Sequence, residues 1–526
     1  MENTKSQPLQ IKKGPIIAVM LMGAFVAILN QTLMNVALPQ MMGDLGISAN
    51  TGQWLTTAYM LTNGVLIPVT AFLIGKFSTR KLFLASMVLF AIGTLLCGVG
   101  PGFGSVLAGR IIQASGAGII MPLMMNVFLT IFPVEKRGSA MGLVGMAMIF
   151  APAIGPTLSG WIVQNYSWRV LFFIVLPIAV IDIILASFML KNVTKLTNPK
   201  VDVSSIILST FGFGGFLYGF SSAGSSGWDS VKVIGSLAVG VIALVLFIGR
   251  QLKSENPMLE FRVFKYNMFA LTTLINMIIT MAMFAGMILV PIYLQNIRGF
   301  TPLESGLLLL PGAILMGIMS PITGRIFDKI GARWLAVTGL AITVITTWQF
   351  SNLTDSTTYM HLIILYSARM FGMSMLMMPI MTAGLNQLPQ KWNAHGTAMS
   401  NTMRMISGSL GTAYLVTVMS NQTQDHVVKG LAAKGIQIPD GVEFTASGSK
   451  EALAQMPPEM QQQIMSVVKH STIQGINDAF VVATGMAVAA LLLSFFIQRT
   501  APPQEEQIEA YTKKAGPKAK ATVPQG

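Results

Sequence analysis

Residues 105–131 read SVLAGRIIQASGAGIIMPLMMNVFLTI. The stretch is long enough to cross the apolar core of a bilayer as a helix, which takes about 20 residues. It contains one charged side chain, Arg110. A charge inside hydrocarbon is costly, so such a residue has a structural or functional partner. The stretch therefore predicts a transmembrane helix with an arginine in its interior.

Similar stretches recur along the whole chain, and together they predict an all-α integral membrane protein with fourteen transmembrane helices. Proline and glycine inside several of them are tolerated where neighbouring helices satisfy the freed backbone groups. The first stretch is too long for the core of a signal peptide, so we expect it to remain uncleaved. The predicted spans are 15–38, 53–75, 82–99, 105–131, 139–163, 168–190, 203–222, 231–250, 267–295, 303–324, 333–352, 360–388, 395–420 and 473–497.

The composition excludes soluble domains. Of 526 residues, 53% are hydrophobic and only 10% are charged, whereas a soluble protein carries about 25% charged residues. One cysteine, Cys97, excludes a disulfide framework and a cysteine-rich metal site, and the four histidines are dispersed. The chain also has no HExxH sequence and no phosphate-binding loop of the GxxxxGK[ST] type. We therefore expect no metal, no cofactor, no enzymatic activity and no ATP-driven transport by this chain alone.

Basic residues fix the expected orientation. Most of the 34 lysines and arginines fall in segments that are cytoplasmic when both termini are cytoplasmic. This asymmetry supports an even number of spans. It also explains the formal net charge of +14 without nucleic acid as a partner.

An internal repeat relates the two ends of the chain. Arg137-Gly-Ser-Ala-Met141 opens the fifth span and His395-Gly-Thr-Ala-Met399 opens the thirteenth. Arg110 of the fourth span has a counterpart, Arg369, at almost the same separation, and the loop 75–81 matches 324–333. Transporters are often built from duplicated bundles around a midplane site. The repeat predicts two six-helix bundles that enclose a cavity, with the seventh and eighth spans inserted between them.

The resulting organisation has five parts. We predict a cytoplasmic tail (1–14), a first six-helix bundle (15–190), two inserted helices with linkers (191–266), a second bundle (267–497) and a cytoplasmic tail (498–526). Within the second bundle, residues 421–472 are polar enough to form an extracellular loop. Met460, Ile464, Val467 and Val468 in that loop have helical spacing. They predict an amphipathic helix on the outer surface, or alternatively a lid over an outward-facing cavity.

Several motifs, in order along the chain, resemble the major facilitator superfamily. The stretches are LNQTLMNVALP (29–39), LAGRIIQASGAG (107–118), APAIGPTLSGW (151–161) and WRVLFF (168–173) with Pro177. They are similar to the fourteen-helix drug:proton antiporter branch of the EmrB/QacA type. Two departures stand out. Asn30 replaces an aspartate common in the first motif, and the shortened loop 75–81 lacks the central Asp and Gly that the second copy keeps as Asp328 and Gly331.

The resemblance implies a proton-coupled exporter of lipophilic or amphipathic compounds that works by alternating access. Its implied partners are the lipid bilayer, a small-molecule substrate and protons, and the implied state is a monomer in a bacterial plasma membrane. A dedicated exporter of an endogenous lipid, peptide, siderophore or nucleotide signal is the alternative. Without an acid at Asn30, an obligatory cationic substrate is disfavoured.

Four ionisable residues are candidates for proton coupling, namely Asp182, Arg110, Asp478 and Arg404. Asp182 lies midway along the sixth span and Asp478 near the outer end of the last, while every other acid falls in a loop, a tail or a span end. An unpaired carboxylate in hydrocarbon sits protonated or faces water. Its depth in the membrane therefore makes Asp182 the best candidate for the proton carrier. The alternative is that Asp182 is a protonated, hydrogen-bonded residue between two helices. Arg110 is the most plausible type of partner for Asp182. The alternative is that Arg110 only holds two helices together.

Polar side chains at helical spacing predict the walls of a substrate cavity, although hydrogen bonds between helices would also explain them. These candidates are Asn30, Gln31, Asn35, Tyr59, Asn63, Gln113, Asn276 and Thr280. Many of the 38 methionines serve as core filling, and some would offer an adaptable surface to varied ligands.

A third set of residues predicts a gate, which the resemblance supports, with simple tight packing of helices as the alternative for its glycines. Small residues let helices approach closely, and an aspartate near a helix N-terminus can cap it or pair with arginine. The hypothesis is that the charged cytoplasmic loops form a latch. The gating and motif candidates are Gly75, Arg80, Gly155, Pro156, Gly160, Gly324, Asp328, Gly331 and Arg333.

Overall fold

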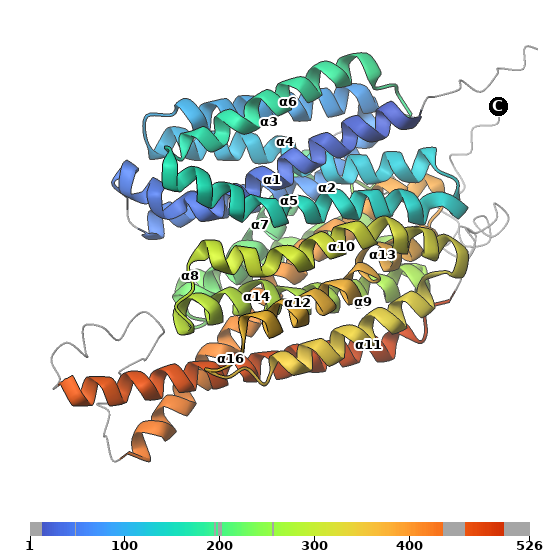
Figure 1. Ribbon diagram of the computed structural model, residues 1–526. Helices are drawn as coiled ribbons and strands as arrows, with labels where there is room; N and C mark the ends of the chain where they lie inside the picture. The colour runs from blue at the N-terminus through green and yellow to red at the C-terminus, as the bar shows by residue number, and fades with distance from the viewer. Residues whose placement is uncertain are drawn as a thin grey trace, which may run out of the picture.

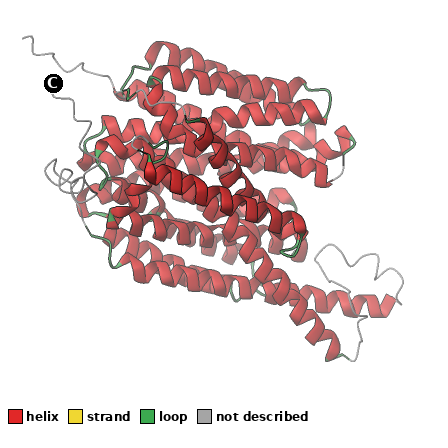
Figure 2. Cartoon of the chain, turned by 180° about the vertical axis from the view of Figure 1, so that it is seen from behind, coloured by secondary structure: helices red, strands yellow, loops and turns green. Residues whose placement is uncertain are grey.

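The computed structural model describes residues 13–47, 49–193, 196–197, 202–254, 257–434 and 458–498. Throughout these ranges the regular structure is helical (Figures 1 and 2). The predicted tails, apart from Lys13, Gly14 and Gln498, lie outside the described residues.

The helices of the first half and of the inserted hairpin follow the predicted spans closely. They are α1 (Lys13–Leu45), α2 (Ala49–Lys76), α3 (Thr79–Val99), α4 (Phe103–Ile131), α5 (Arg137–Asn165), α6 (Arg169–Met189), α7 (Val203–Ser226) and α8 (Val231–Lys253).

The second half contains the same kind of helix with one interruption. Its elements are α9 (Asn267–Ile292), α10 (Pro302–Ile330), α11 (Ala332–Phe350), α12 (Tyr359–Ser374), α13 (Met377–Leu385), α14 (Asn393–Ala432) and α16 (Pro458–Ser494). The predicted span 360–388 is broken between α12 and α13, close to Pro379, which supplies no backbone N–H.

Figure 1 shows two layers of roughly parallel helices. Helices α1–α6 form the upper group, α9–α16 form the lower group, and α7 and α8 lie behind the line between them. The longest contact between the two groups runs along α5 and α10. This arrangement places α2, α4 and α5 of the first half against the second.

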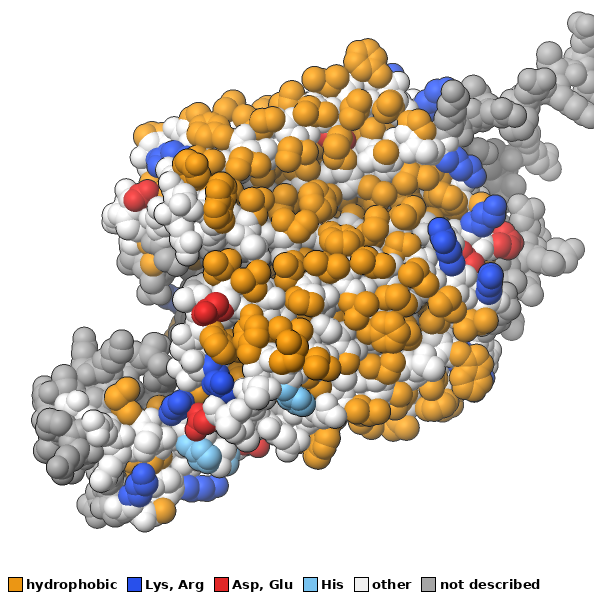
Figure 3. All heavy atoms as spheres, in the orientation of Figure 1, with side chains coloured by type: hydrophobic (Ala, Val, Ile, Leu, Met, Phe, Trp, Pro, Cys, Tyr) orange, Lys and Arg blue, Asp and Glu red, His pale blue; other side chains and the backbone are white. Residues whose placement is uncertain are grey.

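Twelve helices in the described residues are long and apolar enough to cross a membrane. The other two predicted spans coincide with α11 and α14, whose polar residues dilute their apolarity. The count of fourteen spans therefore stays a prediction. Figure 3 shows apolar side chains over the middle of the visible face, with lysine and arginine toward both of its ends. Phe188 of α6, for example, is 83% exposed, which fits a surface covered by lipid.

The segment 421–472 differs from the single loop that we predicted. α14 continues to Ala432 and α16 begins at Pro458, so both helices run beyond the bundle and pack against each other (Figure 1). Ile464 and Val467 are buried at this contact rather than lying on a surface. Gly430 of α14 faces Val467 closely enough that a Cβ there would lie 2.7 Å from it. The amphipathic pattern thus reflects helix pairing, and residues 435–457 lie outside the described residues.

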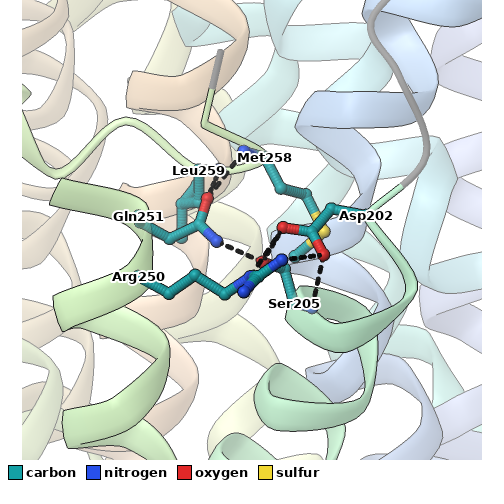
Figure 4. Close-up of polar contacts among 6 residues, drawn as sticks. All are labelled: Asp202, Ser205, Arg250, Gln251, Met258 and Leu259. Atoms are coloured by element: carbon teal, nitrogen blue, oxygen red, sulfur yellow. Dashed lines mark hydrogen bonds and ion pairs between the residues drawn. The ribbon is translucent and has the colours of Figure 1, made fainter. Parts of the chain in front are cut away.

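A polar cluster closes one end of the inserted hairpin (Figure 4). Asp202 caps α7 by accepting a hydrogen bond from Ser205 N at 3.2 Å, and Arg250 of α8 donates to both of its carboxylate oxygens, at 2.9 and 3.0 Å. Gln251 donates to Ser205 Oγ at 2.6 Å and accepts from Met258 N at 2.7 Å. The cluster therefore ties α7, α8 and the following linker together.

The hydrogen bonds from Arg250 lower the pKa of Asp202 from its ordinary value of 3.8 to about 2. A depressed pKa means that the carboxylate stabilises the fold above about pH 4 and loses this effect as the pH falls toward 2. We expect Asp202→Asn to destabilise the protein by less than about 1 kcal/mol near neutral pH, because the pair is largely exposed. Thermal unfolding followed by tryptophan fluorescence should show that the difference in stability between the parent and Asp202→Asn becomes smaller below pH 4. A stability difference that grows as the pH falls would contradict the stabilising role of the ionised Asp202 carboxylate.

Candidate functional site

Arg110 lies at the centre of a buried polar cluster in the first half. Its side chain is 1% exposed and donates to Asn30 Oδ1 of α1 at 2.9 Å and to Gln113 Oε1 at 2.6 Å. Arg110 Nε also donates to the carbonyl of Leu55 in α2 at 3.3 Å. The guanidinium lies over the ring of Tyr59, 4.0 Å from its centroid, where the negative face of the ring favours a cation.

The cluster holds a cation without a carboxylate. Of the described ion pairs none includes Arg110, and its partners are neutral oxygens and one aromatic ring. Gln113 extends the network to α3 by donating to Thr94 Oγ1 at 2.7 Å. The predicted candidates Asn30, Tyr59 and Gln113 are thus brought together around Arg110. The residue that departs from the family pattern, Asn30, stands directly at the guanidinium.

Arg369 forms a comparable cluster in the second half. It is fully buried, donates to Thr347 Oγ1 of α11 at 3.2 Å and to the carbonyl of Ala282 in α9 at 2.7 Å. Its Nη1 atom has no hydrogen-bond partner and lies against Gly286, a position where any Cβ would collide with the guanidinium. The two arginines therefore sit in matching helices of the two halves and use similar neutral acceptors.

Arg404 and Asn276 line a small internal cavity of about 10 Å³ between α9, α13 and α14. Arg404 Nη2 donates to Asn401 Oδ1 at 3.2 Å, whereas Asn276 Oδ1 is buried without a partner. This is about the smallest space that can hold one water molecule. Thr280 lies one turn further along α9 and donates to the carbonyl of Asn276 at 2.7 Å, so its hydroxyl proton is used within the helix.

Methionine sulfurs join α14 to the first half. Asn401 Nδ2 lies 3.2 Å from Met125 Sδ in α4, and Arg404 Nη1 lies 3.7 Å from Met148 Sδ in α5. Thioether sulfur is a weak acceptor on a flexible side chain. Contacts of this kind are easily exchanged when two surfaces move past each other.

Asp182 is buried in α6 and stands apart from the arginines. Its exposed fraction is 0%, and neither carboxyl oxygen has a hydrogen-bond partner. A Cβ placed on Gly23 of α1 would lie 2.8 Å from Asp182 Oδ2 and equally close to Phe83 of α3. The carboxyl therefore lies in an apolar pocket between α1, α3 and α6, and the contact with Arg110 that we considered is not formed.

Asp478 occupies a different environment. Its Oδ2 atom lies 2.8 Å from His426 Nε2, across the contact between α16 and the extended part of α14, and both side chains are partly exposed. The pair lies in the part of the bundle that we predict to be extracellular. Asp478 is thus accessible to water, whereas Asp182 is not.

Asp328 joins the two halves at the end that the basic residues predict to be cytoplasmic. It lies near the end of α10 and accepts hydrogen bonds from the backbone of Gly138 at 2.8 Å and of Ser139 at 2.9 Å, and from the Ser139 hydroxyl. Gly138 and Ser139 form the first turn of α5, where unsatisfied N–H groups and the helix dipole favour a negative charge. Arg137 adds a bond to Asn386 Oδ1 at 3.1 Å.

Glycines allow this seam between α5 and α10 to close. A Cβ at Gly324 would collide with the carbonyl of Gly138, and a Cβ at Gly142 would lie 2.6 Å from the carbonyl of Ser320. Ser320 Oγ donates to the carbonyl of Gly142 at 3.0 Å. Gly331 ends α10 with φ of 83°, a conformation that suits glycine. Arg333 follows it and lies beside Trp334, its guanidinium carbon 5.8 Å from the ring centroid.

The corresponding loop of the first half makes no such bridge in its described contacts. Arg80 donates from its backbone to Asn192 Oδ1 at 3.3 Å and from its side chain to the carbonyl of Ser187, while the carbonyl of Gly75 accepts from Thr197 N at 3.0 Å. These partners belong to the first half and its linker. The loop without the Asp thus contacts its own half, and the loop with the Asp crosses to the other.

The remaining candidates are more dispersed. Gly155 packs so closely on Thr32 of α1 that a Cβ would overlap its hydroxyl, whereas a Cβ at Gly160 would meet open space. Asn63 and Gln31 are half-buried. For Asn35 and Pro156 the structure describes only the backbone.

Sequence reasoning missed several partners of these residues. Asn401, Thr94, Thr347 and Asn386 complete the polar clusters, yet each is an ordinary small polar residue in an apolar helix. Asn401 stands one turn before Arg404, and this spacing was the one available signal.

We expect Asp328→Asn to weaken the seam by about 1–2 kcal/mol, because the variant loses the charge at the α5 N-terminus. This corresponds to roughly a 5–30-fold shift toward the form that is open at this end. Spin labels on Lys136→Cys and Lys329→Cys, with Cys97 replaced by Ala, would report the separation of the two exposed positions. Asp229→Asn, an exposed acid in the turn between α7 and α8, is the control. Identical distance distributions for both variants and the parent would remove Asp328 from the latch.

Comparison with known families places the chain clearly. A model described as "Major Facilitator Superfamily" matches residues 20–412. The "Uncharacterized MFS-type transporter YhcA" of Bacillus subtilis (strain 168) is 50% identical over 491 residues, covering 92% of each chain. The "Lincomycin resistance protein LmrB" of the same organism is 41% identical over 501 residues, covering 95% of this chain and 98% of that one.

A more distant relative is the "Multidrug export protein EmrB" of Escherichia coli (strain K12), which is 30% identical over 426 residues, covering 80% of this chain and 83% of that one. Among solved structures, the human organic anion transporter MFSD10 superposes with a TM-score of 0.59 at 12% identity, covering 93% of this chain and 100% of that one. At this identity the likeness shows the fold alone.

Proposed function

The chain belongs to the Major Facilitator Superfamily, and we propose that it exports lipophilic or amphipathic compounds in exchange for protons by alternating access. The names of LmrB and EmrB, lincomycin resistance and multidrug export, support this substrate range. The chain is a multi-pass membrane transporter with bacterial relatives. We further propose fourteen spans, cytoplasmic termini, a plasma-membrane location and a monomeric state.

The observation that best supports alternating access is the contact between α5 and α10. Two glycine-lined helices meet there, and Asp328 and Ser320 of α10 form hydrogen bonds with the N-terminal part of α5. Opening of this end breaks the hydrogen bonds of Asp328, Ser320 and Arg137 across the seam. The contacts of α14 with the first half involve adaptable methionines. Rigid halves joined in this way can rock about a central site.

Arg110 and its partners form the proposed substrate side of the mechanism. The cluster carries a positive charge and offers no anion, which supports substrates that are neutral or that present carbonyl or other electron-rich oxygens. A permanent cation would be repelled by Arg110 when it comes near. Asn30 therefore acts as a specificity residue in this proposal.

Asp182 is the proposed proton carrier. An ionised carboxylate without hydrogen bonds in an apolar pocket is strongly unfavourable. Any movement of α6 against α1 and α3 that admits water would change its affinity for a proton. The tight contact with Gly23 makes this environment sensitive to the packing of α1, the helix that also holds Asn30.

We expect Asp182→Asn to reduce gradient-driven export at least tenfold while substrate binding persists, because the amide cannot carry the proton. Export into acidic-inside vesicles and equilibrium binding of a fluorescent substrate would be compared with Asp229→Asn. Export in Asp182→Asn with the wild-type pH dependence would move the proton site elsewhere, and Asp478 would be the next candidate.

We expect Asn30→Asp to raise export of a lipophilic cation relative to a neutral compound, because the new carboxylate would neutralise Arg110 at 2.9 Å. The ratio of the two transport rates in proteoliposomes is the measurement. Asn165→Asp adds the same charge at the exposed end of α5 and serves as the control. An unchanged ratio in Asn30→Asp would show that this position does not select substrate charge.

A further inference from the structure

A second, much larger pocket lies away from the polar clusters, between α2 and α4 of the first half and the inserted helices α7 and α8. Its volume is about 680 Å³, within the range of sites that hold small molecules. The lining is apolar apart from four hydroxyl groups and contains no charged side chain. Neither the repeat, the seam nor the polar clusters account for this pocket.

The pocket opens onto the surface that faces lipid. Phe211 of α7 and Val239 of α8 stand at its rim and are 59% and 52% exposed. The apolar surface continues along α8 through Ile242 and Val245, which are also exposed. A molecule in the pocket would therefore reach it from the bilayer and could remain partly in the bilayer.

Three of the four hydroxyls in the lining, all except Thr62, already donate their proton to the backbone. Ser115 donates to the carbonyl of Ile111, Thr210 to that of Ile206, and Ser236 to that of Val233, at 2.8, 2.8 and 3.0 Å. Each proton is thus used within its own helix. A drug-like ligand needs a few well-placed polar partners, whereas a hydrocarbon chain needs none.

Glycines create the space. α7 and α8 approach closely at Gly215 and Gly240, where a Cβ would meet the opposite backbone within 2.8 Å. Beside this crossing, Gly214 faces only Val65 at 3.5 Å and Gly235 faces open space. The hairpin is therefore tightly closed at the crossing and open next to it.

The hairpin is attached differently to the two halves. Trp228 in its turn donates to Thr417 Oγ1 of α14 at 2.7 Å, and Glu260 N in the following linker donates to His395 Nδ1 of α14 at 3.3 Å. Toward α2, described contacts are apolar and aromatic, as in the stacking of Trp54 on Tyr218 with centroids 5.7 Å apart. The pocket lies in this apolar contact between the hairpin and the first half.

We propose that the pocket binds one acyl chain of a bilayer lipid, which fills the contact between the inserted hairpin and the first half. The occupant is a hydrocarbon chain because the lining is uncharged, its hydroxyl donors are largely used, and its rim is continuous with the lipid-facing surface. The head group stays outside the pocket, so recognition depends on the chain and not on the polar group.

The test uses the full-length protein in nanodiscs that contain phosphatidylglycerol or phosphatidylethanolamine with a photoreactive diazirine midway along one acyl chain. After irradiation, labelled peptides are mapped by mass spectrometry. We expect labelling of 61–66 and 210–215 to exceed labelling of the exposed face of α3 around Ile92 severalfold, with either head group.

Two filling variants on different helices, Gly214→Leu and Gly235→Leu, should each lower this labelling severalfold. Gly249→Leu makes the same change at an open, exposed position of α8 outside the pocket and should leave it unchanged. The proposal would be overturned if the pocket were labelled no more than α3, or if labelling persisted in both filling variants. It would also be overturned if labelling depended on the head group. Displacement of the label by an exported compound would instead identify a substrate site and also overturn it. The readout requires no transport, so it stands apart from the proposed function.

Discussion

A guanidinium buried among apolar helices must find its hydrogen-bond acceptors there, and this requirement organises both halves of the protein. Arg110 draws α1, α2 and, through Gln113, α3 toward α4, using a side-chain amide, a backbone carbonyl and the ring of Tyr59. Arg369 does the same for α9 and α11 around α12. Because the acceptors are neutral, each cluster keeps its positive charge. Both bundles are therefore built around a fixed cation in the interior.

The two bundles are joined mainly along α5 and α10, by a carboxylate and by close backbone contacts. Asp328 reaches across to the first turn of α5, and the glycines beside it bring the two backbones together. The link also includes the bonds from Arg137 to Asn386 and from Ser320 to the carbonyl of Gly142, and contacts to methionine sulfur. Internal rigidity with a compliant boundary is the physical condition for rocking of two halves. The inserted hairpin follows α14 through hydrogen bonds and meets α2 through apolar surface, which places it across the same boundary.

Much of the fold was predictable because hydrophobic length, basic loops and the repeat are local properties of the sequence. The family assignment was confirmed for the same reason, since its motifs are short and ordered along the chain. Partners from other helices could not be predicted. Nothing in the sequence placed Asn30 on Arg110 or Gly23 on Asp182, and an amphipathic pattern around Ile464 indicated a surface helix where two long helices pair. Spacing along one helix defines a face, but packing decides what that face meets.

The central claim is that substrate export is exchanged for protons, and a flux measurement in proteoliposomes tests it most directly. The purified protein would be reconstituted with a pH-sensitive dye inside the vesicles and with the membrane potential clamped at zero. A lipophilic compound would then be added on one side without a pH gradient. Exchange predicts that the protein-dependent flux of the compound, measured above that of protein-free vesicles, is accompanied by protons moving in the opposite direction at a constant ratio. Protein-dependent movement of the compound with no proton movement would contradict the account.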